Sequence, residues 1–289
     1  MTLDNLLILL LSTLFHVLAN TAFKRARIPA VFSWGMIVAA VILYAPLLYF
    51  TRNLTPFSLG ILALSGLLDA AYFVSMSRAY ALTDLSVAYP LARGLAPLLL
   101  AVWAILFLGE APTAFGAAGI GLIVLGLYTV NLRGPDGWKK PLHSLRHPGA
   151  RFALLAGLFI SLYTALDKYG LKTTGLPPLT YTYWTLFFTA LWLTPLILRT
   201  QARATIREEL RADWLLLLLA GLATLGAYGL VMIVVGRGTP ISYAGAVREF
   251  SVVLGAFVGW RFLKEKQGPM RVLGAALVAL GVVAIGLAG

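Results

Sequence analysis

Ten long apolar runs dominate this chain of 289 residues, and they constrain its fold more than any other feature. A helix needs about 20 apolar residues to cross the hydrocarbon layer of a bilayer, which is roughly 30 Å thick. Hydrophobic residues make up 60% of the chain and charged residues only 12%, more apolar and less charged than soluble domains. The pattern predicts an all-α integral membrane protein with ten transmembrane helices, at about 3–22, 30–50, 57–80, 86–108, 113–131, 152–170, 178–199, 213–235, 240–263 and 269–287.

The longest break between the apolar runs is the polar, Gly- and Pro-containing segment LRGPDGWKKPLHSLRHPGAR at 132–151. It leaves five predicted helices on each side. We therefore predict a first five-helix repeat over 1–131, a cytoplasmic linker over 132–151 and a second five-helix repeat over 152–289.

The two halves share a sequence register. A shift of 155 residues aligns the fourth run with the ninth and the fifth with the tenth, without a gap. A weaker register of 147 residues relates the first run to the sixth. Because each half has an odd number of helices, the two copies must cross the membrane in opposite senses, and inverted repeats of this kind are typical of alternating-access transporters. The matched pairs include Arg93 with Arg248, Glu110 with Glu265, Gly119 with Gly274, Gly126 with Gly281, His16 with Tyr163, and Asn20 with Asp167.

The basic residues indicate orientation. The net charge is +12, but 17 of the 23 Lys and Arg residues fall in connections on one side of the predicted bundle and only 4 on the other. Cytoplasmic loops carry such an excess, so we expect a multi-pass protein of the inner membrane with both termini on the non-cytoplasmic side. This distribution argues against a nucleic-acid partner. The first apolar run lacks a basic segment before it and a clear cleavage site, and we expect it to be retained as a helix.

Two arginines, Arg93 and Arg248, lie inside predicted helices, about 10 Å from the membrane faces. A charge at this depth is costly and usually faces a polar cavity or a partner. In one interpretation each arginine pairs with a carboxylate and joins helices. In the other, at least one of them binds an anionic group of a substrate. The carboxylates available for pairing are Asp69, Asp84 and Glu249.

Helical spacing selects further candidates. His16 and Asn20 share a face of the first helix with Ser12, and either a lining of a cavity or satisfied packing explains them. Asp69 is the carboxylate nearest mid-membrane; with Glu249 it is a candidate site for proton or cation coupling, unless it only pairs with an arginine. Candidate substrate contacts are Arg93, Arg248, Asp69, His16, Asn20, Tyr72, Tyr163 and Trp184, although an interfacial aromatic belt would also explain Trp184.

Other charged and proline positions are interpreted as follows. Asp167, next to Lys168, is expected to be a solvated pair near the outer end of the sixth helix, and Glu110 a solvated cap. Pro90 and Pro97 remove backbone hydrogen bonds around Arg93 and are candidate gating residues. Residues 203–213 suggest a short helical cytoplasmic loop.

Enzymatic chemistry finds no support in the sequence. There is no cysteine, no phosphate-binding loop for ATP, and no Glu partner that would make His143 and His147 a convincing zinc pair. We expect neither cofactor nor metal, and no enzyme; an integral-membrane enzyme or a scaffold is the alternative of another class.

A duplicated five-helix unit, with an arginine in its fourth helix, FLGE at the end of that helix in the first copy and a glycine-spaced fifth helix, resembles the EamA-like families of the drug/metabolite transporter superfamily. The resemblance covers about 3–131 and 152–287 and implies a ten-helix exporter with a cavity lined by the first four helices of each half. The second copy departs from the pattern: Lys264 replaces the Gly before the Glu, and Gly245 and Val252 stand where the first copy has proline.

We therefore expect a secondary active or facilitated transporter, acting by alternating access, for a small zwitterionic metabolite such as an amino acid. The mixed charges and aromatic residues of the candidate cavity favour this class. The alternative is an organic anion, such as a phosphonate or phosphate ester, held by Arg93 and Arg248. Expected partners are the substrate, the lipid bilayer and, as an open question, protons; the chain is a monomer or a homodimer.

Overall fold

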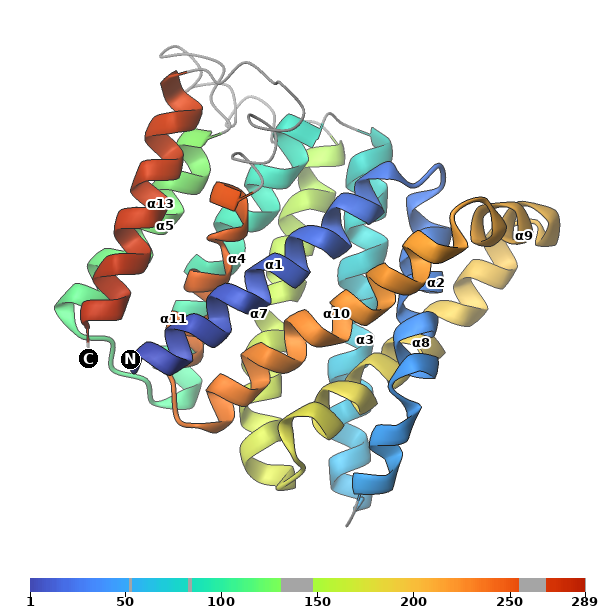
Figure 1. Cartoon of the computed structure of the whole chain (residues 1–289), viewed down its shortest axis with the longest axis horizontal. Coiled ribbons are helices and arrows are strands. Elements are labelled where there is room, and N and C mark those ends of the chain that lie inside the picture. Colours follow the sequence, from blue (N-terminus) through green and yellow to red (C-terminus); the bar gives the residue numbers. More distant parts are fainter. Residues whose placement is uncertain (52–53, 83–84, 131–147, 255–268, 289) are drawn as a thin grey trace.

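The computed structural model describes residues 1–51, 54–82, 85–130, 148–254 and 269–288, and within these ranges the chain is helical without strands (Figure 1). In this described part of the chain, seven helices are long and apolar enough to cross a membrane. The prediction of an all-helical membrane protein is confirmed in these ranges. The seven helices are α1 (Leu3–Arg25), α3 (Pro56–Leu82), α4 (Leu85–Leu108), α7 (Pro148–Thr174), α8 (Pro178–Thr200), α10 (Trp214–Gly236) and α13 (Pro269–Leu287).

Two further apolar helices are shorter than a typical membrane span: α2 (Pro29–Leu43) has 15 residues and α5 (Ala114–Val130) has 17. The single span predicted at 30–50 is interrupted, because α2 ends at Leu43 and a 3₁₀ helix, η1 (Ala45–Phe50), follows. Pro46 lies at the start of η1 and has no backbone N–H to continue the α-helical hydrogen bonds. The helix expected in the loop at 203–213 is present as α9 (Arg203–Ala212).

The ninth predicted span, at 240–263, is not one continuous α-helix in its described part. Helix α11 (Ile241–Arg248) ends at a turn formed by Glu249 and Phe250, after which residues 251–254 are helical again. Positions 255–263 lie outside the described residues, so ten complete spans are not confirmed. The corresponding helix of the first half, α4, continues from Leu85 to Leu108 through both Pro90 and Pro97. The break therefore lies in the copy that lacks the prolines.

The main contacts between a helix of the first half and a helix of the second have counterparts in which the two halves trade places. Helix α1 packs on α10 and α11, and its counterpart α7 packs on α3 and α4; α2 packs on α10 as α8 does on α3. Helices α5 and α13 pack on each other at one edge of the bundle. Helix α1 rises from the lower edge in Figure 1, whereas α7 descends toward it. The described helices therefore form two repeats of opposite direction.

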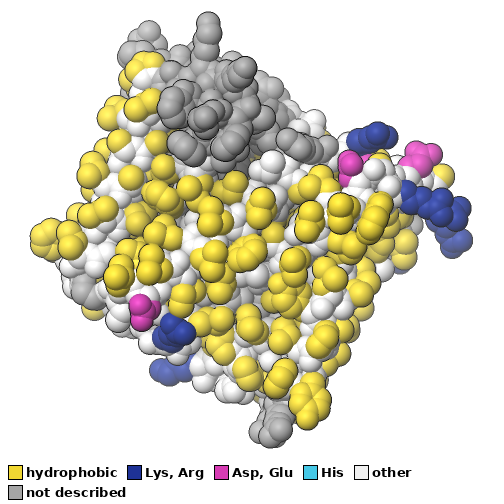
Figure 2. Space-filling model, in the orientation of Figure 1, with side chains coloured by type: hydrophobic (Ala, Val, Ile, Leu, Met, Phe, Trp, Pro, Cys, Tyr) yellow, Lys and Arg dark blue, Asp and Glu magenta, His cyan; other side chains and the backbone are white. Residues whose placement is uncertain are grey.

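The face of the bundle that carries α1 and α10 is apolar over most of its width (Figure 2). In Figure 2, hydrophobic side chains cover the exposed face of α1 and α10, and charged side chains gather at its two ends. On α1 the exposed leucines include Leu7, Leu11, Leu14 and Leu18. A soluble protein rarely exposes a continuous apolar face of this extent, and lipid is the solvent that such a surface fits.

Candidate functional site

A central cavity of about 90 Å³ lies between the two halves. One water molecule needs roughly 10–15 Å³ of such space, so the cavity has room for several waters or for a small metabolite. Its walls come from α1, α2, α3, α4, α7, α8, α10, α11 and the turn after α11, and none of the lining residues belongs to α5 or α13. This agrees with the family resemblance, which placed the fifth and tenth helices outside. Of the sequence candidates, the lining contains His16, Asn20, Asp69, Tyr72, Arg93, Pro97, Tyr163, Arg248 and Glu249.

Arg93 and Glu249 form an ion pair across the cavity. The Arg93 Nη1 donates to Glu249 Oε1 at 3.1 Å, and each side chain is only 5% exposed. Arg93 comes from α4 in the first half, and Glu249 follows α11 in the second. The pair therefore connects the two repeats at the point where α11 breaks, which is the contact that the structural interpretation of the arginines anticipated.

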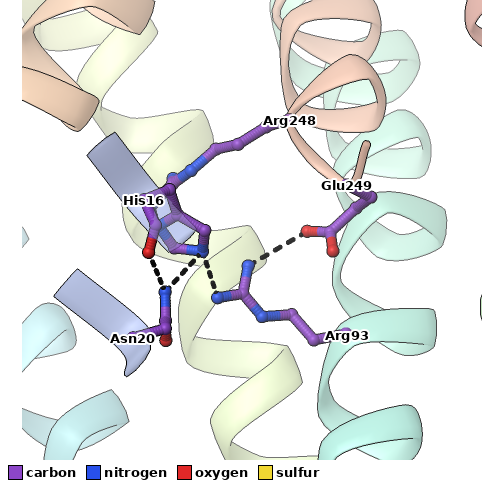
Figure 3. Close-up of polar contacts among 5 residues, drawn as sticks. All are labelled: His16, Asn20, Arg93, Arg248 and Glu249. Atoms are coloured by element: carbon purple, nitrogen blue, oxygen red, sulfur yellow. Dashed lines mark hydrogen bonds and ion pairs between the residues drawn. The ribbon is translucent and has the colours of Figure 1, made fainter. Parts of the chain in front are cut away.

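His16 lies at the centre of the polar contacts in Figure 3. Its Nε2 contacts Nη2 of Arg93 and lies 2.9 Å from Nδ2 of Asn20, one helical turn further along α1. Its Nδ1 lies 3.2 Å from Nη2 of Arg248. A helix of the first half thus carries an imidazole between the two arginines that the repeat register aligns.

Arg248 differs from Arg93 in its surroundings. Its guanidinium lies over the ring of Tyr228, 5.4 Å from the ring centroid, and its Nε is buried without a hydrogen-bond partner. The described residues form two ion pairs, and Arg248 belongs to neither. A cation–π contact with Tyr228 thus stands where a carboxylate usually accompanies a buried arginine.

Asp69, on α3, contributes a carboxylate to a different part of the cavity wall. It is 6% exposed, and its Oδ2 accepts a hydrogen bond of 3.0 Å from the hydroxyl of Thr189 on α8. It takes part in neither of the two described ion pairs. Asp69 thus forms no direct ion pair with an arginine among the described residues, and Arg248 acts on it electrostatically. Among the alternatives, Asp84 lies outside the described residues.

Aromatic side chains cover the remaining polar wall. The ring of Tyr163 lies 6.3 Å from that of Tyr72 and 5.9 Å from that of Tyr228. Trp184 does not line the cavity: its indole N–H donates to Thr51 at 3.1 Å, and its ring packs on Phe187 and Phe188. Pro97 lines the cavity, and the side chain of Pro90 is outside the described part of the chain.

The expectation for Asp167 is wrong. Its side chain is fully buried, not solvated beside Lys168, and accepts hydrogen bonds from Ser65, Tyr181 and Tyr228. Helix α7 continues to Thr174, so Asp167 lies two turns inside its end. Asp167 is not among the residues that line the cavity, but Tyr228, one of its hydrogen-bond donors, is.

Glu110 is also not a solvated cap. Its carboxylate pairs with Lys168 and accepts hydrogen bonds from the backbone N–H groups of Ile241 and Ser242, at 2.6 and 3.2 Å. A carboxylate at this position satisfies N–H groups that the first turn of α11 leaves without intrahelical partners. Its repeat counterpart, Glu265, lies outside the described residues.

Several cavity residues were not singled out from the sequence. Tyr228, Thr164, Thr185 and Thr224 all line the space. The register of 155 residues was the available signal for two of them, because it places Thr224 on Asp69 and Tyr228 on Phe73, which also lines the cavity. Within the described ranges, no group of three His, Cys, Asp or Glu side chains is placed to hold a metal ion.

Membrane-length helices in two opposed repeats, around a buried polar cavity, define a multi-pass membrane protein of the transporter class. The family model of the EamA-like transporter family matches residues 5–132 and 147–287, one match for each half. The chain belongs to this family, and it is a membrane transporter of the drug/metabolite transporter superfamily.

The fold has a close parallel among solved structures. One of them, titled only "Crystal structure of protein", superposes with a TM-score of 0.73 over 98% of both chains at 16% sequence identity. At this identity the likeness concerns the fold. No curated protein sequence matches the chain.

Proposed function

We propose that this protein is a secondary transporter that exports a small zwitterionic metabolite, such as an amino acid, across the inner membrane by alternating access. One observation carries the substrate class. Neither Arg248 nor Asp69 belongs to one of the two ion pairs of the described residues, and both line the same cavity. A zwitterion supplies both missing charges.

The charges fit the two ends of an amino acid. The carboxylate is placed at Arg248 and the ammonium at Asp69, and Tyr72 and Tyr163 add aromatic surface near the amine. Charge-assisted hydrogen bonds of this kind are stronger than neutral ones. The small cavity favours a compact substrate over a large amphipathic one.

The broken helix supports alternating access. Arg248 and Glu249 lie at the end of α11, where the helix stops and restarts, and Glu249 is paired with α4 of the other repeat. Interrupted helices at the interface of inverted repeats are where such transporters bind substrate and change conformation. A proton gradient is the proposed energy source, with Asp69 binding either a proton or the substrate amine; Glu249 is the second candidate.

An organic anion is the second candidate substrate. The convergence of Arg93, Arg248 and His16 on one region favours it, because these three side chains offer N–H donors to a phosphonate or phosphate ester. The two classes differ in their need for Asp69, which an anion without an amine does not contact.

Reconstitution into liposomes tests the function directly. Uptake of labelled amino acids is measured with and without a pH gradient for the wild-type protein and for Arg248→Ala. Arg199→Ala, which removes an exposed arginine at the end of α8, is the matched control. We expect gradient-dependent uptake that Arg248→Ala abolishes and Arg199→Ala preserves. Equal uptake by a folded Arg248→Ala variant contradicts the proposal.

A further inference from the structure

The hydrogen-bond donors around His16 determine which of its ring nitrogens carries a proton. Two groups approach Nε2: the Arg93 guanidinium, which can only donate, and the side-chain amide of Asn20. The same amide nitrogen of Asn20 lies 2.8 Å from the backbone carbonyl oxygen of His16 and donates to it. The amide therefore presents its N–H₂ group, not its oxygen, to the ring. Nε2 must be the unprotonated acceptor.

In a neutral imidazole the proton then lies on Nδ1. The group 3.2 Å from Nδ1 is Nη2 of Arg248, another obligatory donor, so these two N–H groups face each other without an acceptor. The other protonation states are worse. A proton on Nε2 opposes Arg93 and Asn20 together, and an imidazolium opposes all three neighbours and adds a positive charge between two guanidiniums.

Arg248 has a second unsatisfied donor. Its Nε is buried and has no hydrogen-bond partner, and its guanidinium lies over the face of Tyr228. Figure 3 shows Arg248 extending from α11 toward His16 on α1. Both residues line the cavity. The wall between α1 and α11 therefore carries positive charge and N–H groups in need of an acceptor.

We propose that His16 and Arg248 together form the binding site for a carboxylate group of the substrate. A carboxylate has about four lone-pair positions and one negative charge, so it accepts from the Nδ1–H of His16 and from Arg248 at once. It turns a donor–donor contact into two hydrogen bonds. This assignment rests on the proposed function for the identity of the substrate, but the geometry of the site does not depend on it.

The two arginines that the repeat register aligns then have different roles. Arg93 already donates to Glu249 and to His16, and by occupying Nε2 it directs the imidazole proton toward Arg248. Arg93 is a positioning residue, and Arg248 is the one that contacts the substrate. The inverted repeat has placed two arginines at corresponding positions, and the single histidine of α1 makes them unequal.

The tautomer of His16 is the first test. The chain has three histidines, and the variant His143→Gln/His147→Gln leaves only His16. Nitrogen-15 NMR of this protein, labelled in its imidazole ring, distinguishes Nδ1–H from Nε2–H and from imidazolium. We expect Nδ1–H. In Arg93→Leu/Glu249→Leu, which removes both charges of the pair, we expect a mixture of the two tautomers. A dominant Nε2–H form or an imidazolium in the protein with Arg93 intact overturns the proposal.

Titration with acetate is the second test, with methylammonium and methylphosphonate as comparisons. Acetate is expected to shift the His16 resonances saturably, and methylammonium is not. Arg248→Gln is expected to weaken acetate binding by roughly tenfold to a hundredfold, the usual range for a charged hydrogen bond, and Arg199→Gln to leave it unchanged. No response to acetate, or a response to methylphosphonate alone, overturns the carboxylate assignment.

The two proposals can fail separately. If acetate shifts His16 as expected but no amino acid is transported by liposomes, the carboxylate site stands and the proposed function fails. If amino acids are transported equally well by Arg248→Gln and by the wild-type protein, transport stands and the carboxylate site is wrong.

Discussion

Gly119 on α5 and Gly281 on α13 meet backbone to backbone. A Cβ added to Gly119 would lie 2.8 Å from the carbonyl oxygen of Gly281, and a Cβ added to Gly281 would lie 2.6 Å from that of Gly119. Gly126 and Gly274 repeat the contact, at 2.7 and 2.6 Å. The register of 155 residues maps each glycine pair onto the other, so the two contacts are related by exchange of the halves. The contact between α5 and α13 is thus related to itself by the same exchange of halves that relates the helices around the cavity.

A methyl group at these contacts should loosen the outer pair. Gly126→Ala places a Cβ against the backbone of α13, where only a shift of the helices can make room, and we expect a loss of about 1–3 kcal/mol. Gly121→Ala is the control on the same helix, because nothing lies within 4 Å of its added Cβ. Thermal denaturation in detergent compares the two. Equal melting temperatures would show that the close approach contributes nothing.

Removing one partner of the ion pair between Arg93 and Glu249 should destabilise the protein, because the other charge is then buried and unpaired. Arg93→Leu leaves the carboxylate of Glu249 buried without its cation, which costs about 3–5 kcal/mol for such pairs. The double variant Arg93→Leu/Glu249→Leu removes both charges and should recover much of that loss. Melting temperatures of the two single variants and the double variant form the cycle. A double variant that is less stable than either single variant would contradict this account.

Asp167 should be more important for folding than its position near a lysine suggested. Asp167→Ala deprives three hydroxyl donors, those of Ser65, Tyr181 and Tyr228, of their acceptor, at about 1–3 kcal/mol for each group left unsatisfied. Asp167→Asn keeps one acceptor oxygen and should lose less. The exposed Asp213, which makes no cap hydrogen bond at the start of α10, is the matched control. The free energy of unfolding of Asp213→Ala should lie within about 0.5 kcal/mol of the wild-type value. Comparable melting of Asp167→Ala and Asp213→Ala would show that the buried network is dispensable.

The contrast between Arg93 and Asp167 shows what the sequence can predict. A charge inside an apolar run is costly wherever it lies, so Arg93, Arg248 and Asp69 were identifiable without a structure. The partners were not, because Glu249 and His16 approach Arg93 from helices far away in the chain. Asp167 lies deeper in its helix than the sequence predicts, because the sixth apolar run ends at about 170 and α7 ends at Thr174. The sequence alone does not distinguish a solvated carboxylate from a buried one at this position.

The face of a membrane helix that meets the cavity is also hard to predict from sequence. Helical spacing places Trp184 on one face of its helix, but it does not say which face meets the cavity. In a soluble protein the polar face marks the outside; in a membrane the outside is apolar too. Trp184 consequently faces Thr51, while its neighbours Thr185 and Leu186 line the cavity. The repeat register predicts more of the fold than helical periodicity does, because it relates helices α4 and α5 to α11 and α13.

Asp69 should separate the two candidate substrate classes. Asp69→Asn removes the negative charge proposed for the amine, and transport of a zwitterion should fall by roughly tenfold to a hundredfold. Binding of acetate or methylphosphonate should stay within about twofold, because neither carries an ammonium for a carboxylate to pair with. Asp4→Asn, at an exposed position at the start of α1, is the control for the loss of one acid. Full transport of amino acids by Asp69→Asn would show that Asp69 does not bind the substrate amine.

The orientation of the chain can be tested with single cysteines, because the natural sequence has none. Asn5, at the start of α1, donates a hydrogen bond of 3.0 Å to Thr239, just beyond the end of α10. Helix α9 precedes the opposite end of α10, which has 23 residues and is therefore roughly 35 Å long. The N-terminus and α9 thus belong to opposite faces of the bundle, and Figure 1 places the C-terminus near the N-terminus.

We expect a membrane-impermeant maleimide, added to intact cells whose outer barrier is permeable to it, to label Thr2→Cys and Ala288→Cys but not Arg207→Cys on α9. The reason is that the connections on the side of α9 carry an excess of Lys and Arg, which is typical of cytoplasmic loops. After the cells are broken open, all three positions should react, which controls for accessibility. Labelling of Arg207→Cys alone in intact cells would invert the orientation, and the export direction proposed above would have to be assigned to the opposite face of the cavity.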